Sequence, residues 1–109
     1  MTGVIEQARV GAEITVRLVG TGYDFTDVTE ARAAVIKPDG SEAVIVVQLA
    51  DLGLGDDGDE VLVRMGGNVD MEGTYRVQLY TREAGQQNQQ IGKAVRFRAE
   101  QRLIADVWA

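Results

Sequence analysis

Short stretches of alternating apolar and polar residues, each closed by a turn signal, dominate this sequence. In the segment Glu13–Leu18 the apolar residues Ile14, Val16 and Leu18 occupy every second position, which is typical of a strand with one face on a core. The same period of two recurs further along the chain. The other positions predicted to face a core are Ala31, Ala33 and Val35, then Val61, Val63 and Met65, then Tyr75, Val77 and Leu79, and finally Val95 and Phe97.

The segment Ala31–Lys37 is the weakest of the predicted strands, because alanine has a low strand propensity. A helix over Val28–Ile36, capped by Thr26 or Asp27, is the competing interpretation. After it, Pro38-Asp39-Gly40 predicts a turn, since proline presets its own φ and glycine accepts a positive φ. The β-branched run Ala43–Leu49 then completes a predicted hairpin.

These segments together predict an all-β fold. Strands recur at intervals of about 10 to 15 residues with turn signals between them, which is typical of an antiparallel β-sandwich of about seven strands. No linker or internal repeat divides the chain, so we expect one domain over residues 1–109, with its core at about residues 10–99 and an apolar C-terminal tail at residues 100–109.

The composition argues against catalysis. The chain has no His, no Cys and a single Ser (Ser41), so the commonest general base and the soft metal ligands are absent. We therefore expect a binding or structural module that is not an enzyme and carries no cofactor. A net charge of −6 disfavours nucleic acid and anionic membranes as partners. No signal peptide and no apolar run of membrane-spanning length is predicted.

One acidic cluster, Asp56–Glu60, has the oxygen ligands and the flexible glycine that suit Ca²⁺. Its spacing does not match an EF-hand loop, and a solvated turn is the favoured interpretation, so we expect no metal site. Asp24, Asp27 and Asp39 are interpreted as turn or cap residues.

The C-terminal tail supplies most of the candidate contact residues. A Trp next to the last residue is costly to leave in water, so the tail either folds back on its own domain or docks on a neighbouring subunit. Tyr80, which faces outward on its predicted strand, is a further interface candidate. The predicted partner-binding residues are Leu103, Ile104, Val107, Trp108 and Tyr80.

The segment Glu72–Val77 resembles the immunoglobulin pattern in which an acidic-Gly-x-Tyr segment precedes the second disulfide cysteine. Val77 stands at the cysteine position, and Met71 stands where the acidic residue is usual. The resemblance implies that the Tyr75 hydroxyl bonds back to upstream backbone. The alternative is a strand that begins at a glycine and carries a core tyrosine, and this also gives a sandwich.

The order of motifs is similar to a family of small immunoglobulin-like domains in tailed-phage structural proteins, including the N-terminal domain of baseplate upper proteins. The resemblance covers about residues 10–99 and lies in the order of its motifs. These are the strand Gly11–Leu18, the segment Asp24–Thr29, the turn Lys37–Gly40, the Asp57-Gly58 turn with the strand that follows it to Met65, the segment Glu72–Tyr75 and the strand Ala94–Ala99.

The resemblance implies a non-enzymatic structural component of a virion, in capsid decoration, neck, tail or baseplate, assembled in the host cytoplasm. Its partners would be other virion proteins and copies of itself. A carbohydrate- or host-surface-binding module is the alternative, and it requires exposed aromatic residues from among Tyr23, Phe25, Tyr80 and Trp108. An accessory domain of a larger hydrolase is the second alternative.

Overall fold

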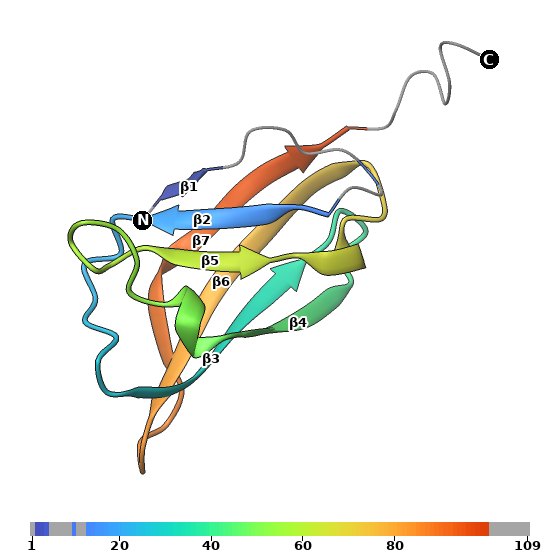
Figure 1. Cartoon of the computed structure of the whole chain (residues 1–109). Helices are drawn as coiled ribbons and strands as arrows, with labels where there is room; N and C mark the ends of the chain where they lie inside the picture. Colours follow the sequence, from blue (N-terminus) through green and yellow to red (C-terminus); the bar gives the residue numbers. More distant parts are fainter. Residues whose placement is uncertain (1, 5–9, 11–12, 101–109) are drawn as a thin grey trace.

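The computed structural model describes residues 2–4, 10 and 13–100, and it is an all-β architecture of antiparallel strands in two sheets (Figure 1). One sheet has the strand order β1-β2-β5, and the other has the order β4-β3-β6-β7. The strands are β1 (Thr2–Val4), β2 (Thr15–Val19), β3 (Val28–Ile36), β4 (Glu42–Val47), β5 (Val61–Arg64), β6 (Gly73–Glu83) and β7 (Gln89–Ala99).

Two short 3₁₀ helices, η1 (Leu49–Asp51) and η2 (Gly66–Asn68), flank β5 in the sequence. Among the described residues, no helix has the length and apolar character that a membrane span requires. Asp51 in η1 is buried, and its carboxylate accepts two hydrogen bonds from the Arg64 guanidinium, at 3.0 and 3.2 Å. This pair fixes η1 against β5.

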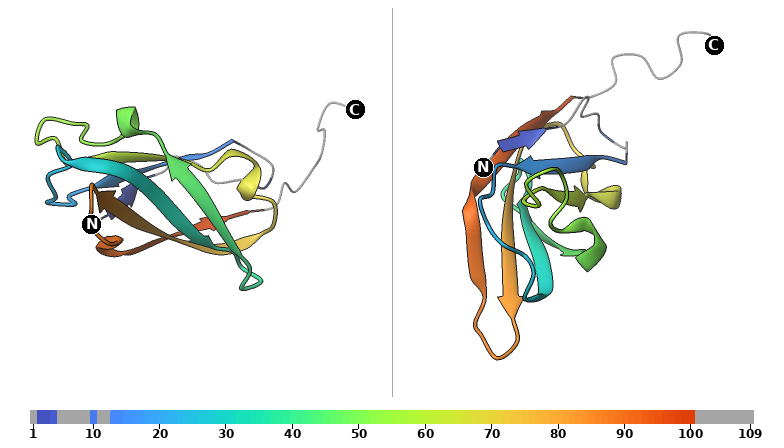
Figure 2. Two further views of the ribbon diagram at one scale, coloured as in Figure 1. Left: turned by 90° about the horizontal axis from the view of Figure 1, so that it is seen from below. Right: turned by 60° about the vertical axis from the view of Figure 1, so that its left-hand side comes forward.

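The two sheets pack on one hydrophobic core, and Figure 2 shows them from two further sides. Burial alternates along the strands, as the period of two predicted, with β2 following the pattern exposed, buried, exposed, buried. Every predicted core position is buried, and the core also takes in Phe25, Val28, Val47, Val69, Ile91 and Ala99.

The helix alternative for Val28–Ile36 is wrong, because this segment is strand β3 in the middle of the four-stranded sheet. It pairs with β4 on one side and β6 on the other, so its backbone forms ladders along both edges. Pairing of this kind overrides the low strand propensity of alanine, and Ala33 is fully buried. Leu49 was expected in the next strand but lies in η1, and β1 was not predicted.

The β3–β4 hairpin has the turn chemistry that its sequence predicts. The Lys37 N–H donates to the Ser41 carbonyl at 2.8 Å, and Gly40, at φ +86°, donates its N–H to the Lys37 carbonyl at 2.9 Å. Pro38 at the tip packs on Gly73 at the start of β6, where an added Cβ would lie 2.6 Å from the Pro38 Cβ. Only glycine fits this contact, so the two motifs at Lys37–Gly40 and Glu72–Tyr75 meet in space.

Tyr75 forms the hydrogen bonds that the sequence motif predicts. Its hydroxyl donates to the Met71 carbonyl at 2.6 Å and accepts from the Met71 N–H at 3.0 Å. The ring is fully buried and stacks on Phe97, with centroids 5.1 Å apart and planes 4° apart. The side chain thus anchors the connection that enters β6 while it fills the centre of the core.

Candidate functional site

The structure places only one of the five predicted partner-binding residues. Tyr80 lies on the outer face of β6 and is 36% exposed, in agreement with its predicted outward position. Leu103, Ile104, Val107 and Trp108 lie outside the described residues, so their role stays a prediction.

The outer face of the four-stranded sheet carries apolar residues beyond Tyr80. Val44 and Val46 on the edge strand β4 are 65% and 64% exposed. The register aligns Val46, Arg32, Tyr80 and Gln90 in one row across all four strands. In the neighbouring row, Val44 pairs with Ala34. We call the set Ala34, Val44, Val46 and Tyr80 the outer apolar patch.

Sequence analysis missed Val44 and Val46, although a signal for them exists. The run Ala43–Val47 is apolar at every position, so a strand there must carry apolar residues on both faces. The structure points Ala43, Ile45 and Val47 inward and leaves the other two valines in water. A fully apolar strand at a sheet edge therefore predicts an exposed apolar patch.

A hollow of about 280 Å³ is lined by three residues of the outer apolar patch, Ala34, Val44 and Tyr80. Its rim is polar, since Arg82 donates to Glu30 at 3.2 Å and to the Asn88 side-chain oxygen at 3.0 Å. The residues around the hollow are Glu30, Arg32, Ala34, Val44, Tyr80, Thr81, Arg82 and Asn88. An apolar centre inside a polar and arginine-bearing rim is typical of protein-contact surfaces.

Positive charge also collects on this face, although the whole chain carries a net charge of −6. Arg76 and Arg96 are direct cross-strand neighbours on β6 and β7. Arg98 pairs with Glu72 at 3.3 Å. The exposed arginines of the outer face are Arg32, Arg76, Arg82, Arg96 and Arg98. Two of these five arginines are engaged by carboxylates, since Arg82 also pairs with Glu30 at 3.2 Å.

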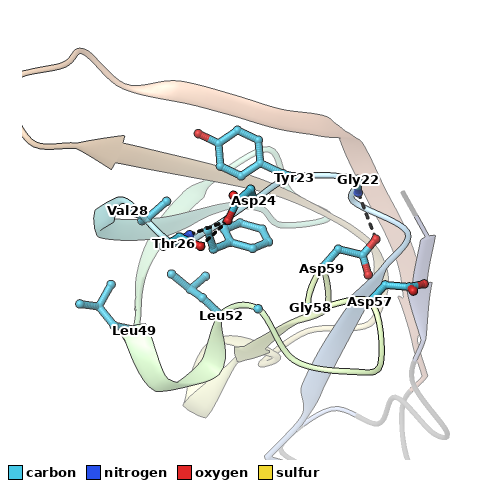
Figure 3. Close-up of a pocket in the computed structure, with 12 residues that line it drawn as sticks. Gly22, Tyr23, Asp24, Thr26, Val28, Leu49, Leu52, Asp57, Gly58 and Asp59 are labelled. Carbon is cyan, nitrogen blue, oxygen red and sulfur yellow. Dashed lines mark hydrogen bonds between the residues drawn. The ribbon is translucent and has the colours of Figure 1, made fainter.

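A second, larger pocket of about 870 Å³ opens among the loops at the end of the sheets where β6 and β7 are joined (Figure 3). Asp24 closes a tight turn in its wall by accepting from the N–H and the hydroxyl of Thr26, at 2.9 and 2.5 Å. These two hydrogen bonds, led by the hydroxyl, lower the pKa of the Asp24 carboxyl. Asp24 is thus a turn residue, as predicted, and its carboxylate is already engaged.

The aromatic residues of this pocket are built into the fold. Phe25 is buried at 8% exposure, so it does not supply the exposed aromatic residue that the carbohydrate-binding alternative requires, and it packs edge-on against Tyr23 at 5.1 Å. The Tyr23 hydroxyl lies 2.9 Å from Glu83 Oε1 and 2.9 Å from the Gln89 side-chain oxygen. Burial and then the hydrogen bond to Glu83 raise the pKa of Tyr23. These contacts join the β2–β3 loop to the β6–β7 hairpin.

The acidic loop Asp56–Glu60 forms the opposite wall of the pocket. Asp59 is part of the loop framework, since its Oδ2 accepts from the Gly22 N–H at 3.1 Å and its carbonyl accepts from the Thr21 hydroxyl at 2.6 Å. Asp57 is exposed on the far side of the loop. Within the part of the chain that the structure describes, no three carboxylates converge as metal ligands would. The geometry is that of an acidic, internally bonded turn.

Ser41, which is the one serine, sits in the exposed β3–β4 turn and donates its hydroxyl to Asp39 at 2.6 Å. A nucleophilic serine needs an adjacent base that is oriented by a third group, and this turn supplies only a carboxylate that also accepts the Ser41 N–H. The hydroxyl thus has a structural partner in the turn.

Comparisons of the chain with protein-family models, with curated proteins and with solved structures give no match of any of the three kinds.

Proposed function

We propose that the chain is an immunoglobulin-like β-sandwich that acts as a non-enzymatic docking module. The strand orders β1-β2-β5 and β4-β3-β6-β7 correspond to A-B-E and C′-C-F-G of immunoglobulin domains. Tyr75 occupies the position of the tyrosine corner and makes the corresponding bonds to the residue four positions upstream. The cysteine pair and the tryptophan of antibody domains are absent, and a long connection from Gln48 to Glu60 stands where strand D would be.

The observation that carries the docking function is the outer face of the four-stranded sheet. Tyr and Arg are the residue types enriched at interface hot spots, and here they surround exposed valines on a rigid sheet. Such a surface gains free energy from burying its apolar centre, while the arginines select an acidic partner. The loop pocket supports glycan binding less well, because Phe25 is buried and the Tyr23 hydroxyl is engaged.

The order of sequence motifs supports placement of this module in the particle of a tailed phage, where it would contact other virion proteins and copies of itself. In a symmetric particle, many modest contacts of this kind add up to firm attachment. The apolar residues Leu103, Ile104, Val107 and Trp108 would add a second anchor.

Incorporation into particles tests the proposal. The tagged chain is supplied during infection by the phage that encodes it, and purified particles are probed for the tag. We expect the native chain in the particles and Tyr80→Glu largely absent from them, whereas Arg17→Glu, on the outer side of β2, serves as the matched control and is retained. A native chain that never co-purifies with particles would refute the virion role, and equal retention of both variants would refute the docking face.

The tail is tested separately in the same assay. If Trp108→Ala and Tyr80→Glu, tested as single variants, are both lost from the particles, the tail and the sheet face both belong to the contact surface. Retention of Trp108→Ala would leave the sheet face as the contact and would refute the tail anchor.

A further inference from the structure

Among the described residues the two sheets have four edge strands, and two of these, β5 and β7, carry features that block pairing with another chain. Strand β5 has only four residues. Strand β7 is interrupted by a bulge, at which Gly92 has φ +66°, and it carries Lys93 and Arg96. Short edges, bulges and charged residues are the features that natural proteins use to prevent edge-to-edge association.

Strand β4 has six residues, Glu42–Val47, and a single charged residue, Glu42, at its first position. It contains no proline and no lysine, and its register with β3 is continuous from Ile36↔Glu42 to Ala31↔Val47. Its outward side chains Val44 and Val46 are β-branched and exposed, which is the composition that favours strand pairing. Compared with the edges of β5 and β7, the edge of β4 is therefore poorly protected against strand pairing.

The backbone groups of β4 alternate in direction, and the hairpin fixes which ones are free. The Lys37 N–H donates to the Ser41 carbonyl and the Lys37 carbonyl accepts from the Gly40 N–H, so both backbone groups of Lys37 bond across the hairpin. Because hydrogen-bonded positions alternate along an antiparallel ladder, Ala43, Ile45 and Val47 bond to β3. The N–H and C=O groups of Glu42, Val44 and Val46 therefore point away from β3.

We propose that β4 pairs with β4 of a second copy of this chain, antiparallel about a two-fold axis at Ile45. This register places Val44 opposite the partner's Val46 and Glu42 opposite the partner's Gln48. It joins apolar residues to apolar residues and brings no like charges together, so the edge is self-complementary. If the register shifted by two residues, the Glu42 carboxylate would lie opposite the partner's Val46. If it shifted by one residue, the free N–H and C=O groups of one β4 would face backbone groups of the partner that already bond to β3.

The pairing also completes the outer apolar patch. Two four-stranded sheets become one sheet of eight strands, and the patches of the two copies meet across the two-fold axis. The inference rests on the proposed docking role of this face, and it names a second copy of the chain as the occupant of its edge.

Sedimentation of the purified full chain as a function of concentration tests the dimer. We expect a monomer–dimer equilibrium that Val44→Pro abolishes, because proline removes an N–H that points away from β3 and spares the internal ladder. Val44→Thr keeps the N–H and the β-branched shape, so it should still dimerise. Should Val44→Pro fail to fold by circular dichroism, Val46→Lys replaces it as the edge-blocking variant.

Single cysteines test the register, since the native chain has none. The two-fold axis puts Ile45 opposite its own copy in a non-hydrogen-bonded pair, within the range of Cα distances that a disulfide requires. Oxidised Ile45→Cys should therefore form a covalent dimer, and Ala43→Cys, displaced from the axis, should not.

A native chain that stays monomeric at all accessible concentrations, or a folded Val44→Pro that still dimerises, would overturn the inference. Capture of an unrelated extended peptide by a monomeric chain would assign the edge to a foreign strand and would also overturn it. Sedimentation of Tyr80→Glu separates the two proposals, because Tyr80 lies on β6, two strands away from the β4 edge, so this variant should still dimerise even though it is lost from particles.

Discussion

Tyr75, near the start of β6, contributes to stability through the hydrogen bonds of its hydroxyl and through the packing of its ring. A single substitution can remove the first contribution and keep the second. Tyr75→Phe removes the hydroxyl and keeps the ring that stacks on Phe97. The Met71 N–H and carbonyl then both lose their partner. The change introduces no new atom and opens almost no cavity, so the measured effect reports the hydrogen bonds.

The expected magnitude follows from the burial of the groups left behind. A buried polar group that loses its partner costs about 1–3 kcal/mol. Met71 is half-buried, so water reaches part of its backbone, and we expect a loss in unfolding free energy of about 1–2 kcal/mol. For a domain of this size that corresponds to a fall in Tm of roughly 4–8 °C for each kcal/mol.

Urea unfolding monitored by far-UV circular dichroism measures the effect, and Tyr80→Phe is the matched control on the same strand. Tyr80 is exposed on the outer face, so its hydroxyl is available to water and its loss should change stability by less than about 0.5 kcal/mol. Equal midpoints for Tyr75→Phe and Tyr80→Phe would refute the argument that the hydroxyl anchors the entry to β6. A larger effect at Tyr80 would refute the assignment of faces along the strand.

Two other predictions concern the loops and use the same unfolding assay. Gly73→Ala should lower stability by more than about 2 kcal/mol, since its φ of +133° is strained for alanine and its Cβ would clash with the rigid Pro38 ring. Gly66→Ala also has a positive φ but meets open space, so it should lose only about 1 kcal/mol, and equal losses would refute the clash. The lowered pKa of Asp24 adds stability above the unfolded-state pKa that disappears as pH falls through the folded value. Thr26→Val should therefore raise the Asp24 pKa in an NMR titration and flatten the acid side of the stability profile, and an unchanged pKa would refute the turn.

Most of the fold was predictable, because turn residues and period-two patterns agree along this chain. Where proline and glycine mark a turn, as at Pro38 and Gly40, the hairpin follows from local chemistry. The start of β3 was not predictable in this way. Val28 and Thr29 follow a polar loop, and their strand conformation depends on pairing with β6, which is distant in sequence. The short strand β1 likewise depends on its pairing with β2.

The candidate site was less predictable, because exposure is a property of the assembled sheet. The run around Ile45 is apolar on both faces, and only the edge position of β4 decides that one of these faces meets water. Phe25 shows the reverse case, since a residue in a polar loop becomes part of the core when the loop folds over the end of the sheets. Local pattern therefore predicts which residues share a face, and topology decides whether that face is covered.

The edge position of β4 links the two proposals for this chain by a physical argument. An uncovered strand with exposed valines costs free energy in the isolated molecule, both as apolar surface in water and as a template for aggregation. A net charge of −6 opposes non-specific association of this chain. An exposed edge can therefore be kept without aggregation if one specific partner covers it. The self-complementary register of Val44 and Val46 provides such a partner within the same gene product. The arginines of the outer face lie on β3, β6 and β7, away from this edge, so one sheet would serve both self-pairing and docking.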